Sequence, residues 1–585
     1  MAFQISPGVN VSEVDLTTII PSVLSTAGAF AGYFPWGPAQ KIVQIPDEIT
    51  LNKYFTGGLG PDSNSYIQFF TSASFLAYGN NLQLVRTVGA NAHNAQANTT
   101  GAVVQIPNKD AFFATGYIQT GHGNVYGAFI SRYPGLIGNS IQVDVFDSSN
   151  TTLFSTATFT TGGVSILWNS VVTSAPSTST WAAAAGAAND EFHIVVSDAG
   201  GLFTGTKGTI LEVWPFMSKA SDAVMSGQSQ YYKQYLYNNS NYIFAVDPVD
   251  YANTNTTWGQ TASGTNGNGV TFARTYTPTT SLPLTQGSDD VGTDANVING
   301  YSLFTNKEFV NISLVMTGGY DTTVQQYVID NVVNARTDCV AFLSPPQTAV
   351  VNQAGSEAAN IITWLGTLAR SSSYAVVDSG WKYEYDKYNQ VYRWIPLNGD
   401  IAGLCAYTDE IRDPWWSPAG LNRGNIKNAI KLAWNPAKSY RDTLYAAGVN
   451  PVVSFPGNGI VLYGDKTLQA KPSAFDRINV RRLFITLEKA ISTAAKYSLF
   501  EFNDDFTRAQ FVALVTPFLR EVQGRRGITD FKVVCDTTNN TPQVIDSNQF
   551  VGDIYIKPAR SINFIQLNFV AVGTGVDFST VVGAV

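Results

Sequence analysis

Charged side chains are scarce in this sequence of 585 residues. Asp, Glu, Lys and Arg together make up 13% of the chain, against roughly a quarter in typical soluble domains. The surface must therefore be built largely from Asn, Thr, Ser, Gln, Gly and Tyr, and such a surface repels its own copies only weakly. This suits a polymer, and it would also suit an extracellular β protein. A net charge of −8 provides no basic field and argues against nucleic-acid binding.

Cysteine and histidine are scarcer still, with three of each. The cysteines are Cys339, Cys405 and Cys535, and the histidines are His93, His122 and His193. They lie far apart in the sequence, and no histidine belongs to a His-Glu-x-x-His arrangement. The scatter predicts neither a disulfide framework nor a metal centre.

Long hydrophobic runs are also missing. The N-terminal residues MAFQISPGVNV have no basic region and no apolar core of the kind that a signal peptide carries. The most apolar run, 19–34, is broken by Pro21 and several small or polar residues, so it falls short of a bilayer span. We expect a soluble protein that is made in a reducing cytoplasm.

No motif for catalysis stands out. The nearest is GIVLYGDKT, residues 459–467, but Asp465 separates Gly464 from Lys466 and puts a carboxylate where a phosphate loop would bind its anion. We interpret this stretch as a strand followed by a Gly-Asp turn. Ser379 and Lys382 match Ser-x-x-Lys, a spacing that is common by chance and here has no Lys-Thr-Gly partner.

Two adjacent acid pairs, 289–290 and 504–505, do not suggest a catalytic dyad. Neighbouring residues of a strand point to opposite faces, and acids at the start of a helix serve as caps. The sequence therefore predicts no enzyme and no cofactor, although acids distant in sequence could still meet in space. The aromatic residues, 12% of the chain, are better explained as core and interface anchors than as a sugar platform.

Periodicity divides the chain into three regions, and its length predicts about two to four domains. In the first region we expect two strands joined by a Pro-Trp-Gly-Pro turn, a short helix capped by Asp47 or Thr50, a longer helix over 64–78 and a strand over 82–88. Between about 90 and 300, Thr, Ser, Asn and Gly dominate and short alternating runs recur, which predicts a β-rich insertion.

Helices and strands alternate again after residue 301, which indicates an α/β layer. We expect a helix over 324–335, the strand CVAFLSPP, a helix over 361–368, the strand SYAVVD and an aromatic hairpin at 381–397. The stripe from Val480 to Ala494 predicts a helix that keeps Arg481, Arg482, Lys489 and Lys496 outside. Asp504 should open the next helix, with Phe511, Leu514, Val515, Phe518 and Val522 inward and a kink at Pro517.

Both ends of the chain have the pattern of strands without a partner. Phe3, Ile5, Val9 and Val11 alternate with polar residues, and Val576, Phe578 and Val582 share one parity after a Gly-Thr-Gly spacer. Ile554 and Ile556 belong to another predicted strand, and Ile565, Leu567 and Phe569 to a further one. Unpaired strand ends are a hazard unless they add to the edge of another sheet. Either end could fold back on its own domain, but two such ends on one chain favour exchange between subunits.

Long, ordered strings then connect the sequence to a known family. They are SPGVNVSEVD, YFPWGPA, FLAYGNNLQLVRTV, YPGLIGNSIQV, SSYAVVDSGWKYEYDKYNQVYRWIPLNGDIAGLCAYTDE, WWSPAGLNRGNI, VLYGDKT, FDRINVRRLF, VVCDTTNNTP and IKPARSINFIQLNFVA. With them the chain resembles the contractile tail sheath proteins of myovirus-type bacteriophages, particularly the T-even branch. The match covers the first ninety or so residues and the C-terminal half, and it is weaker across the insertion.

This resemblance implies a structural subunit of the virion, assembled in the host cytoplasm, with no active site, cofactor or membrane insertion. In that family, hexameric rings stack helically around a tail tube. On a baseplate signal the sheath shortens and drives the tube through the host envelope for genome delivery. The implied partners are further copies of the chain, the tube protein, and the baseplate and tail terminator proteins.

The resemblance also implies a multidomain α+β or α/β fold with a discontinuous core. The core would comprise 21–95 and 301–572, with its C-terminal part facing the tube, and the β-rich insertion 96–300 would lie outside. Residues 1–20 and 573–585 would be arms that add strands to a neighbour's sheet around Ile554, Ile556, Ile565, Leu567 and Phe569. Because the stretch between Ala95 and Gly116 is short, we expect the protruding domain of the largest relatives to be reduced or missing.

One basic cluster is a candidate tube contact. It comprises Arg520, Arg525, Arg526 and Lys532, which could meet an acidic tube. The alternative is a solvated helix end that complements the helix dipole. Two other identities stay open: the sheath of a phage-derived injection machine such as a tailocin or secretion system, and a secreted β-rich adhesin or carbohydrate-active enzyme, which would need an export signal.

Overall fold

The computed structural model describes residues 24–118, 125–247, 257–276 and 280–566. The chain divides into two compact units. We call Ile20–Tyr497 the core unit, and Ser498–Val585 with Met1–Ile19 the C-terminal unit. No helix among the described residues is long and apolar enough to cross a membrane.

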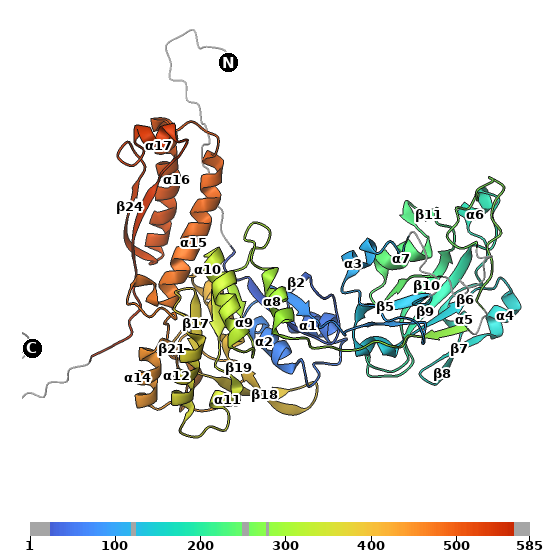
Figure 1. Ribbon diagram of the computed structural model, residues 1–585, viewed down its shortest axis with the longest axis horizontal. Helices are drawn as coiled ribbons and strands as arrows, with labels where there is room; N and C mark the ends of the chain where they lie inside the picture. The colour runs from blue at the N-terminus through green and yellow to red at the C-terminus, as the bar shows by residue number, and fades with distance from the viewer. Residues whose placement is uncertain (1–23, 119–124, 248–256, 277–279, 567–585) are drawn as a thin grey trace, which may run out of the picture. The chain divides into compact units, whose positions relative to one another are not determined.

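A seven-stranded sheet organises the core unit (Figure 1). In spatial order its strands are β2 (Ile42–Ile45), β3 (Leu82–Thr87), β1 (Gly28–Tyr33), β15 (Leu314–Met316), β16 (Val340–Leu343), β17 (Ala375–Asp378) and β21 (Val449–Asn450). All neighbours are parallel except β2 and β3. Strands from both sides of the insertion therefore hydrogen-bond into one sheet, in agreement with a mixed α/β fold.

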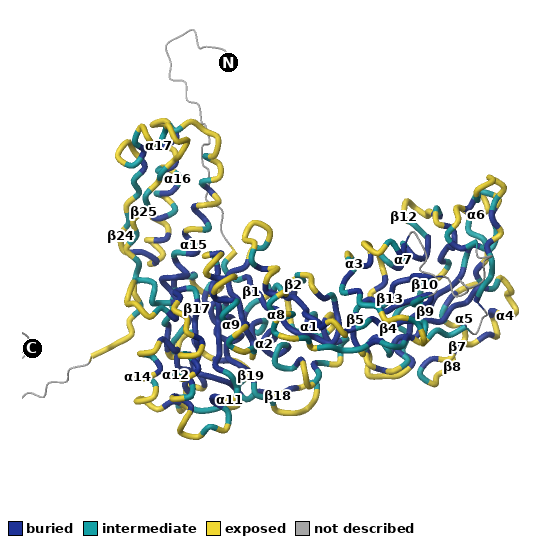
Figure 2. The backbone as a smooth tube through the Cα atoms, viewed as in Figure 1, coloured by how far each residue is buried: buried dark blue, intermediate teal, exposed yellow. Residues whose placement is uncertain are grey.

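Side-chain alternation along the strands explains the two layers of helices. Phe30 points into an apolar cluster with α2 (Tyr66–Leu76) and α13 (Asn398–Ile411). Its neighbours Ala29 and Ala31 point to the opposite cluster. The helices of that cluster include α8 (Asp294–Ser302), α9 (Thr322–Tyr327) and α12 (Glu357–Leu368). Both faces of the sheet are thus buried, as a parallel sheet requires, and Figure 2 shows the continuous buried zone.

Most predicted elements of the core unit are confirmed. Helix α1 (Glu48–Phe55) begins after Asp47, whose carboxylate accepts the Thr50 N–H at 2.7 Å. The aromatic hairpin is β18 (Trp381–Asp386) with β19 (Val391–Pro396). The helix expected over 324–335 is instead three segments, because a π-helical turn, η2 (Val328–Val333), separates α9 from α10 (Asn334–Arg336). Hydrophobic spacing does not reveal a single π turn.

The inserted region is rich in strands, as its composition predicts. One sheet has the order β10 (Thr209–Ser218), β9 (Glu191–Asp198), β6 (Ile141–Phe146) and β14 (Thr280–Pro283); another has β13 (Ile243–Ala245), β5 (Phe129–Pro134) and β4 (Asn94–Gln96). A small hairpin joins β7 (Thr158–Thr161) to β8 (Val164–Leu167). The helices here are short, the longest described one being α7 (Tyr232–Asn239). These sheets share an apolar core that includes Phe129, Val143 and Ile194.

Helix α15 (Ile478–Ala495) ends the core unit and corrects one prediction. Lys496 is exposed, but Arg481 and Arg482 are buried among the residues expected to lie inside. Arg482 pairs with Asp409 of α13, and Arg481 lies on the rings of Tyr374 and Phe475. Hydrophobic periodicity assigned both arginines to the solvent-facing side, because it contains no information on buried partners from other elements.

The C-terminal unit contains α16 (Asp505–Gly524), α17 (Pro542–Asp546) and a hairpin of β24 (Ile528–Val534) and β25 (Asp553–Pro558). Asp504 caps α16 as predicted, accepting the Thr507 N–H at 2.8 Å. The helix is continuous through Pro517. Its buried apolar residues are Phe511, Val515, Leu519 and Val522, whereas Leu514 and Phe518 are only half-buried.

Candidate assembly surface

The hairpin β24–β25 is the element most suited to binding another chain. Phe531 pairs with Ile556 and Val533 with Ile554 in an antiparallel register. Among the described residues, neither strand has a second neighbour. A two-stranded sheet is marginally stable by itself, and a strand edge without a neighbouring strand is a place where another chain can add. The hairpin is therefore a candidate acceptor for a further strand.

The interior of the C-terminal unit fixes this hairpin in place. Ile528 and Cys535, at the two ends of β24, are buried. Asn540 donates to the Val551 carbonyl at 2.8 Å and accepts the Val551 N–H at 2.9 Å, which joins the loop after β24 to the residues before β25. Across the exposed face, Lys557 and Asp530 form an ion pair of 2.9 Å. These contacts hold the hairpin in a fixed position within the C-terminal unit.

The predicted acceptor residues are only partly within the described structure. Ile554 and Ile556 lie in β25 and are half-buried. Ile565 lies outside any described strand and is 78% exposed, and nearby Phe564 is 87% exposed. Leu567 and Phe569, and all the arm residues, lie outside the described residues. The described part of that predicted strand is limited to Ile565 and Gln566, and neither lies in a described strand.

A second apolar surface, which we call the connector, comprises residues 499–506, just before α16 and in its first turn, and the sequence reasoning missed it. Phe500 and Phe502 are 104% and 85% exposed, and Leu499 and Phe506 are also exposed. Polar bonds fix this connector, since Asn503 donates to the Gln549 carbonyl at 2.8 Å and accepts from Arg508 at 2.6 Å. A rigid loop that presents several large apolar side chains to solvent is typical of an interaction site. Their spacing, LFEFNDDF, has no regular period that would have marked them.

The candidate tube residues do gather in one unit. Arg520 lies on α16, Arg525 and Arg526 follow the helix, and Lys532 lies on β24; all four are exposed. Arg525 approaches Glu521 at 3.6 Å. The positions fit a polar contact with an acidic partner, and they equally fit the complement of the negative helix end. The role of these residues as a tube contact stays a prediction.

Comparisons with known proteins decide the family. Residues 314–468 match the model of the phage tail sheath protein central domain, and residues 470–571 match that of the phage tail sheath C-terminal domain. The tail sheath protein of Vibrio phage KVP40 is 34% identical, over 99% of this chain and 100% of the relative. The chain belongs to the phage tail sheath protein family. The resemblance drawn from the sequence strings is confirmed.

Other tail sheath relatives agree. The tail sheath protein of Enterobacteria phage T4 is 32% identical, over 99% of each chain. The tail sheath protein of Salmonella phage ViI is 30% identical, over 99% of this chain and 98% of the relative. The alignment with the KVP40 tail sheath protein spans 714 positions, more than the 585 residues of this chain. That relative therefore carries residues that this chain lacks.

Solved sheath structures resemble this chain only in part. The sheath tail protein Lin1278 from Listeria innocua gives a TM-score of 0.49 at 11% identity, covering 91% of this chain and 95% of that one. The sheath complex of an extracellular contractile injection system, PVC, in the contracted state gives a TM-score of 0.39 at 20% identity, covering 45% of this chain and 71% of that one.

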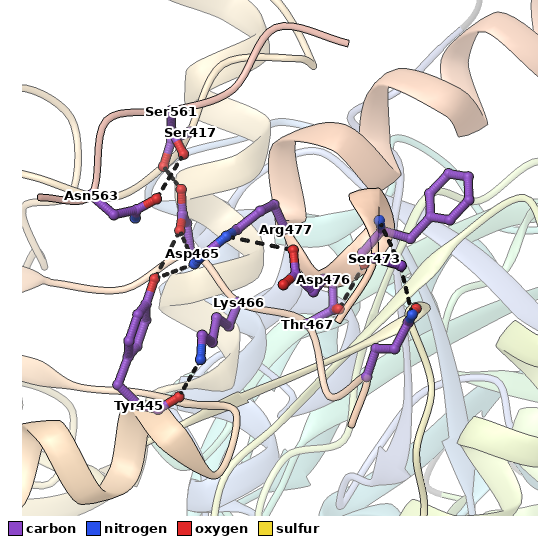
Figure 3. A network of polar contacts seen from close by, with 12 residues as sticks. Ser417, Tyr445, Asp465, Lys466, Thr467, Ser473, Asp476, Arg477, Ser561 and Asn563 are labelled. Atoms are coloured by element: carbon purple, nitrogen blue, oxygen red, sulfur yellow. Dashed lines mark hydrogen bonds and ion pairs between the residues drawn. The ribbon is translucent and has the colours of Figure 1, made fainter. Parts of the chain in front are cut away.

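The one stretch that resembled a phosphate loop is structural in this sheath-family chain (Figure 3). Strand β23 (Gly459–Leu462) ends before Asp465, as predicted. The buried Asp465 carboxylate accepts from the hydroxyl of Ser417 at 3.1 Å, the hydroxyl of Tyr445 at 3.2 Å and the guanidinium of Arg477 at 3.3 Å. Lys466 donates to the Tyr445 carbonyl at 2.7 Å. The network fixes the start of α15. Within it, Lys466 and Arg477 bond to groups of the protein itself, so this stretch does not form a phosphate loop.

The Ser-x-x-Lys match is equally structural. Ser379 accepts the Val452 N–H at 2.9 Å. Lys382 is fully buried and lies 3.0 Å from both Asp400 and Glu384. Burial lowers the pKa of Lys382, but the two carboxylates outweigh it and raise the pKa above its ordinary value. A lysine that stays charged cannot act as the base that the motif needs.

Histidine and cysteine have packing roles where the structure describes them. His193 is buried in β9, where its Nδ1 accepts the Phe216 N–H at 3.0 Å and its Nε2 lies 2.9 Å from the Ser174 carbonyl. Burial lowers the pKa of His193 to about 4. Cys339, Cys405 and Cys535 are buried free thiols, and burial raises the pKa of Cys339 and of Cys405 to about 12. The described residues contain no cluster of potential metal ligands.

Proposed function

We propose that this chain is a structural subunit of a contractile phage tail sheath. Copies form hexameric rings that stack around the tail tube, and contraction drives the tube through the host envelope and delivers the genome. The observation that carries this proposal is the hairpin β24–β25, whose outer edges have no partner among the described residues. The family membership supports the same function, because the curated relatives are tail sheath proteins.

The arms supply the missing strands. Residues Phe3 to Val14 of one copy and Val576 to Val582 of another add to the hairpin of a third, with Ile554 and Ile556 in the acceptor sheet. Main-chain hydrogen bonds give such strand addition its affinity, and alternate side chains give it register. Because the arms are covalently part of their own subunits, neighbours stay connected while the subunits rotate.

The exposed connector adds apolar area to the same interface. The phenylalanines Phe500, Phe502 and Phe506 can each bury roughly 150–250 Å². A soluble monomer rarely leaves several large apolar side chains exposed so near one another in the sequence. The low charge of the chain, 13% charged residues, lets identical surfaces approach without strong repulsion.

Contraction consumes no nucleotide. The extended lattice is metastable, and a barrier separates it from the contracted arrangement. A few kcal/mol released per subunit add up over many rings, in the range of typical two-state switches. The tube, the baseplate and the tail terminator are the remaining partners, and Arg520, Arg525, Arg526 and Lys532 are the proposed polar contact with the tube.

Electron microscopy of the purified protein tests the function. At high concentration, with and without tail tubes, we expect hollow tubes or stacked rings whose diameter exceeds that of the tube. Particles that stay monomeric under every condition, with or without tubes, would contradict a sheath. A sheath from a phage-derived injection machine would give the same images, and the phage origin of the curated relatives favours the phage tail.

A further inference from the structure

The first described residues of the chain are tied to the core on two sides. We call Leu24–Ala27, which run into β1, the arm root. On one side lies the start of β15, where the backbone N–H groups of Ser313 and Leu314 donate to the Ala27 carbonyl at 2.9 and 3.0 Å. The Ser313 hydroxyl donates to the Leu24 carbonyl at 3.1 Å. These are ordinary neutral hydrogen bonds, each of which contributes modestly to stability.

The other side is held by a buried ion pair. The Ser25 hydroxyl donates to Asp409 Oδ2 of α13 at 2.6 Å. The Ser25 carbonyl accepts from Arg482 Nη2 of α15 at 3.4 Å, a long bond. Arg482 and Asp409 are themselves joined twice, Nη1 to Oδ1 at 2.7 Å and Nη2 to Oδ2 at 2.5 Å. We call Ser25, Asp409 and Arg482 the clasp.

Burying the two charges of the clasp costs desolvation free energy, so a gain in stability does not explain why the pair is there. The side chains of Arg482 and Asp409 are each 4% exposed, so both charges have left water. Replacing such a pair with apolar residues is often neutral or stabilising. The bidentate geometry of the ion pair, however, fixes the groups around it. Arg482 Nη1 also donates to the Cys405 carbonyl at 3.2 Å, which anchors the guanidinium to α13. The arrangement therefore fixes the position of Ser25 relative to two helices.

Helix α15 also contacts the residues next to the arm root, at the start of β15. Lys489 of α15 donates to the Ile312 carbonyl at 2.8 Å and to the Ser313 hydroxyl at 3.2 Å. Arg482 and Lys489 are seven residues apart, so they lie on one face of the helix. Helix α15 thus holds the arm root through Arg482 and the strand beside it through Lys489.

We infer that the clasp is a mechanical anchor, in which Arg482, aligned by Asp409, positions the arm root so that tension from a neighbouring subunit reaches α13 and α15. Without the clasp, a pull on residues 1–23 would load the bonds to Leu24 and Ala27 one after another and peel the chain from β15. With the clasp, the pull must also break the hydrogen bonds that tie Ser25 to the buried, charged side chains of Asp409 and Arg482. This inference rests on the proposed exchange of the N-terminal arm.

Arg482→Lys tests the anchor in the full-length protein. Lysine keeps the charge but cannot make two parallel bonds to a carboxylate. Arg481→Lys is the matched control, because Arg481 is the adjacent buried arginine of α15 and stacks on Tyr374 and Phe475 without touching the arm root. Ser25→Ala is a milder variant that removes one hydroxyl and leaves the ion pair in place.

Two readouts are compared between Arg482→Lys and Arg481→Lys: amide exchange of residues 24–33 in the free protein, and the protein concentration at which sheath tubes form. We expect exchange at least tenfold faster and a tube-forming concentration at least tenfold higher in Arg482→Lys, with an intermediate change in Ser25→Ala. Equal values in the two lysine variants, at equal melting temperatures, would overturn the anchor. If Arg482→Lys does not fold, Ser25→Ala decides by the same readouts, with the wild type as its reference.

Deletion of residues 1–20 separates the two levels of the account. If the deletion protein forms tubes like the wild type, the proposed arm exchange fails, and the anchor fails with it. If the deletion abolishes tubes while Arg482→Lys and Ser25→Ala behave like their references, only the anchor fails. Loss of tubes in the deletion together with the expected defect in Arg482→Lys supports both.

Discussion

Phe511 of α16 packs edge-on against Phe550, with ring centroids 5.4 Å apart and ring planes at 79°. The contact joins the helix to the loop before β25. Gly552 continues it, because a Cβ at this position would lie 2.7 Å from the Phe511 ring. The described apolar contact between α16 and this loop therefore helps to hold the hairpin in place.

Phe511→Ala should therefore release the hairpin. Truncating a buried phenylalanine costs about 3–5 kcal/mol, which is a large fraction of the stability of a small unit. We expect amide exchange in β24 and β25 to rise by orders of magnitude while the seven-stranded sheet stays protected. Phe518→Ala, at a half-buried position of the same helix, is the control and should change exchange far less. Unchanged protection of the hairpin in Phe511→Ala would refute this role.

Removing exposed rings from the connector should weaken assembly without weakening the fold. Phe500→Ser with Phe502→Ser removes two solvent-exposed rings, so we expect unfolding free energy to change by no more than about 0.5 kcal/mol per site. The concentration needed for assembly, measured by sedimentation, should rise at least tenfold. Phe309→Ser, which removes an equally exposed ring from the core unit, is the control. Equal assembly of both variants would show that the connector is not an interface.

The buried lysine of the hairpin β18–β19 predicts a strong effect on stability. Lys382→Met leaves Asp400 and Glu384 in the interior without their cation, which should cost roughly 3–5 kcal/mol. Lys431→Met is the control. Its ammonium lies over the Tyr383 ring at 4.9 Å, on an exposed side chain, and should contribute less than about 1 kcal/mol. Chemical denaturation followed by aromatic fluorescence measures both variants, and similar losses would contradict the buried ion cluster.

We expect the inserted sheets to lose stability in acid, because they bury His193. Its folded pKa of about 4 lies below the ordinary value near 6.5, so the unfolded chain binds the extra proton first as the pH falls. The stabilising contribution is complete above pH 6.5 and is lost as the pH falls toward 4, a change on the order of 3 kcal/mol. His193→Gln should flatten this dependence, and His93→Gln should not. Amide exchange of β9 between pH 7 and pH 4 measures the difference; identical slopes in all three proteins would contradict the assignment.

The sequence predicted elements whose signals are local. Asp47 and Asp504 cap helices as expected, because a capping carboxylate needs only the next three residues. The alternation of aromatic and polar residues in 381–396 likewise specified its hairpin. Family membership could also be predicted, because long strings of residues carried it.

The errors arose where a residue's partner is distant in sequence. Arg482 looked like a solvent-facing residue because its counter-ion, Asp409, lies on another helix. The buried histidine, His193, gave no signal, since its acceptor at Ser174 is fixed by the folded sheet. Phe500 and Phe502 fall in a connector without period, so no pattern rule distinguishes exposed from buried rings there. Strand exchange by the two arms rests on residues outside the described structure and stays a proposal.

Cysteine cross-linking between the C-terminal arm and the hairpin shows whether strands are exchanged between subunits. Tyr555→Cys, at an exposed position of β25, is combined in turn with Val576→Cys, Phe578→Cys and Val582→Cys, and the assembled protein is oxidised. If the arm of one copy pairs with the hairpin of another, at least one combination yields a ladder of covalent oligomers on denaturing gels, and the single-cysteine variants do not. Disulfides that form only within one chain, in assembled tubes, would contradict strand exchange between subunits.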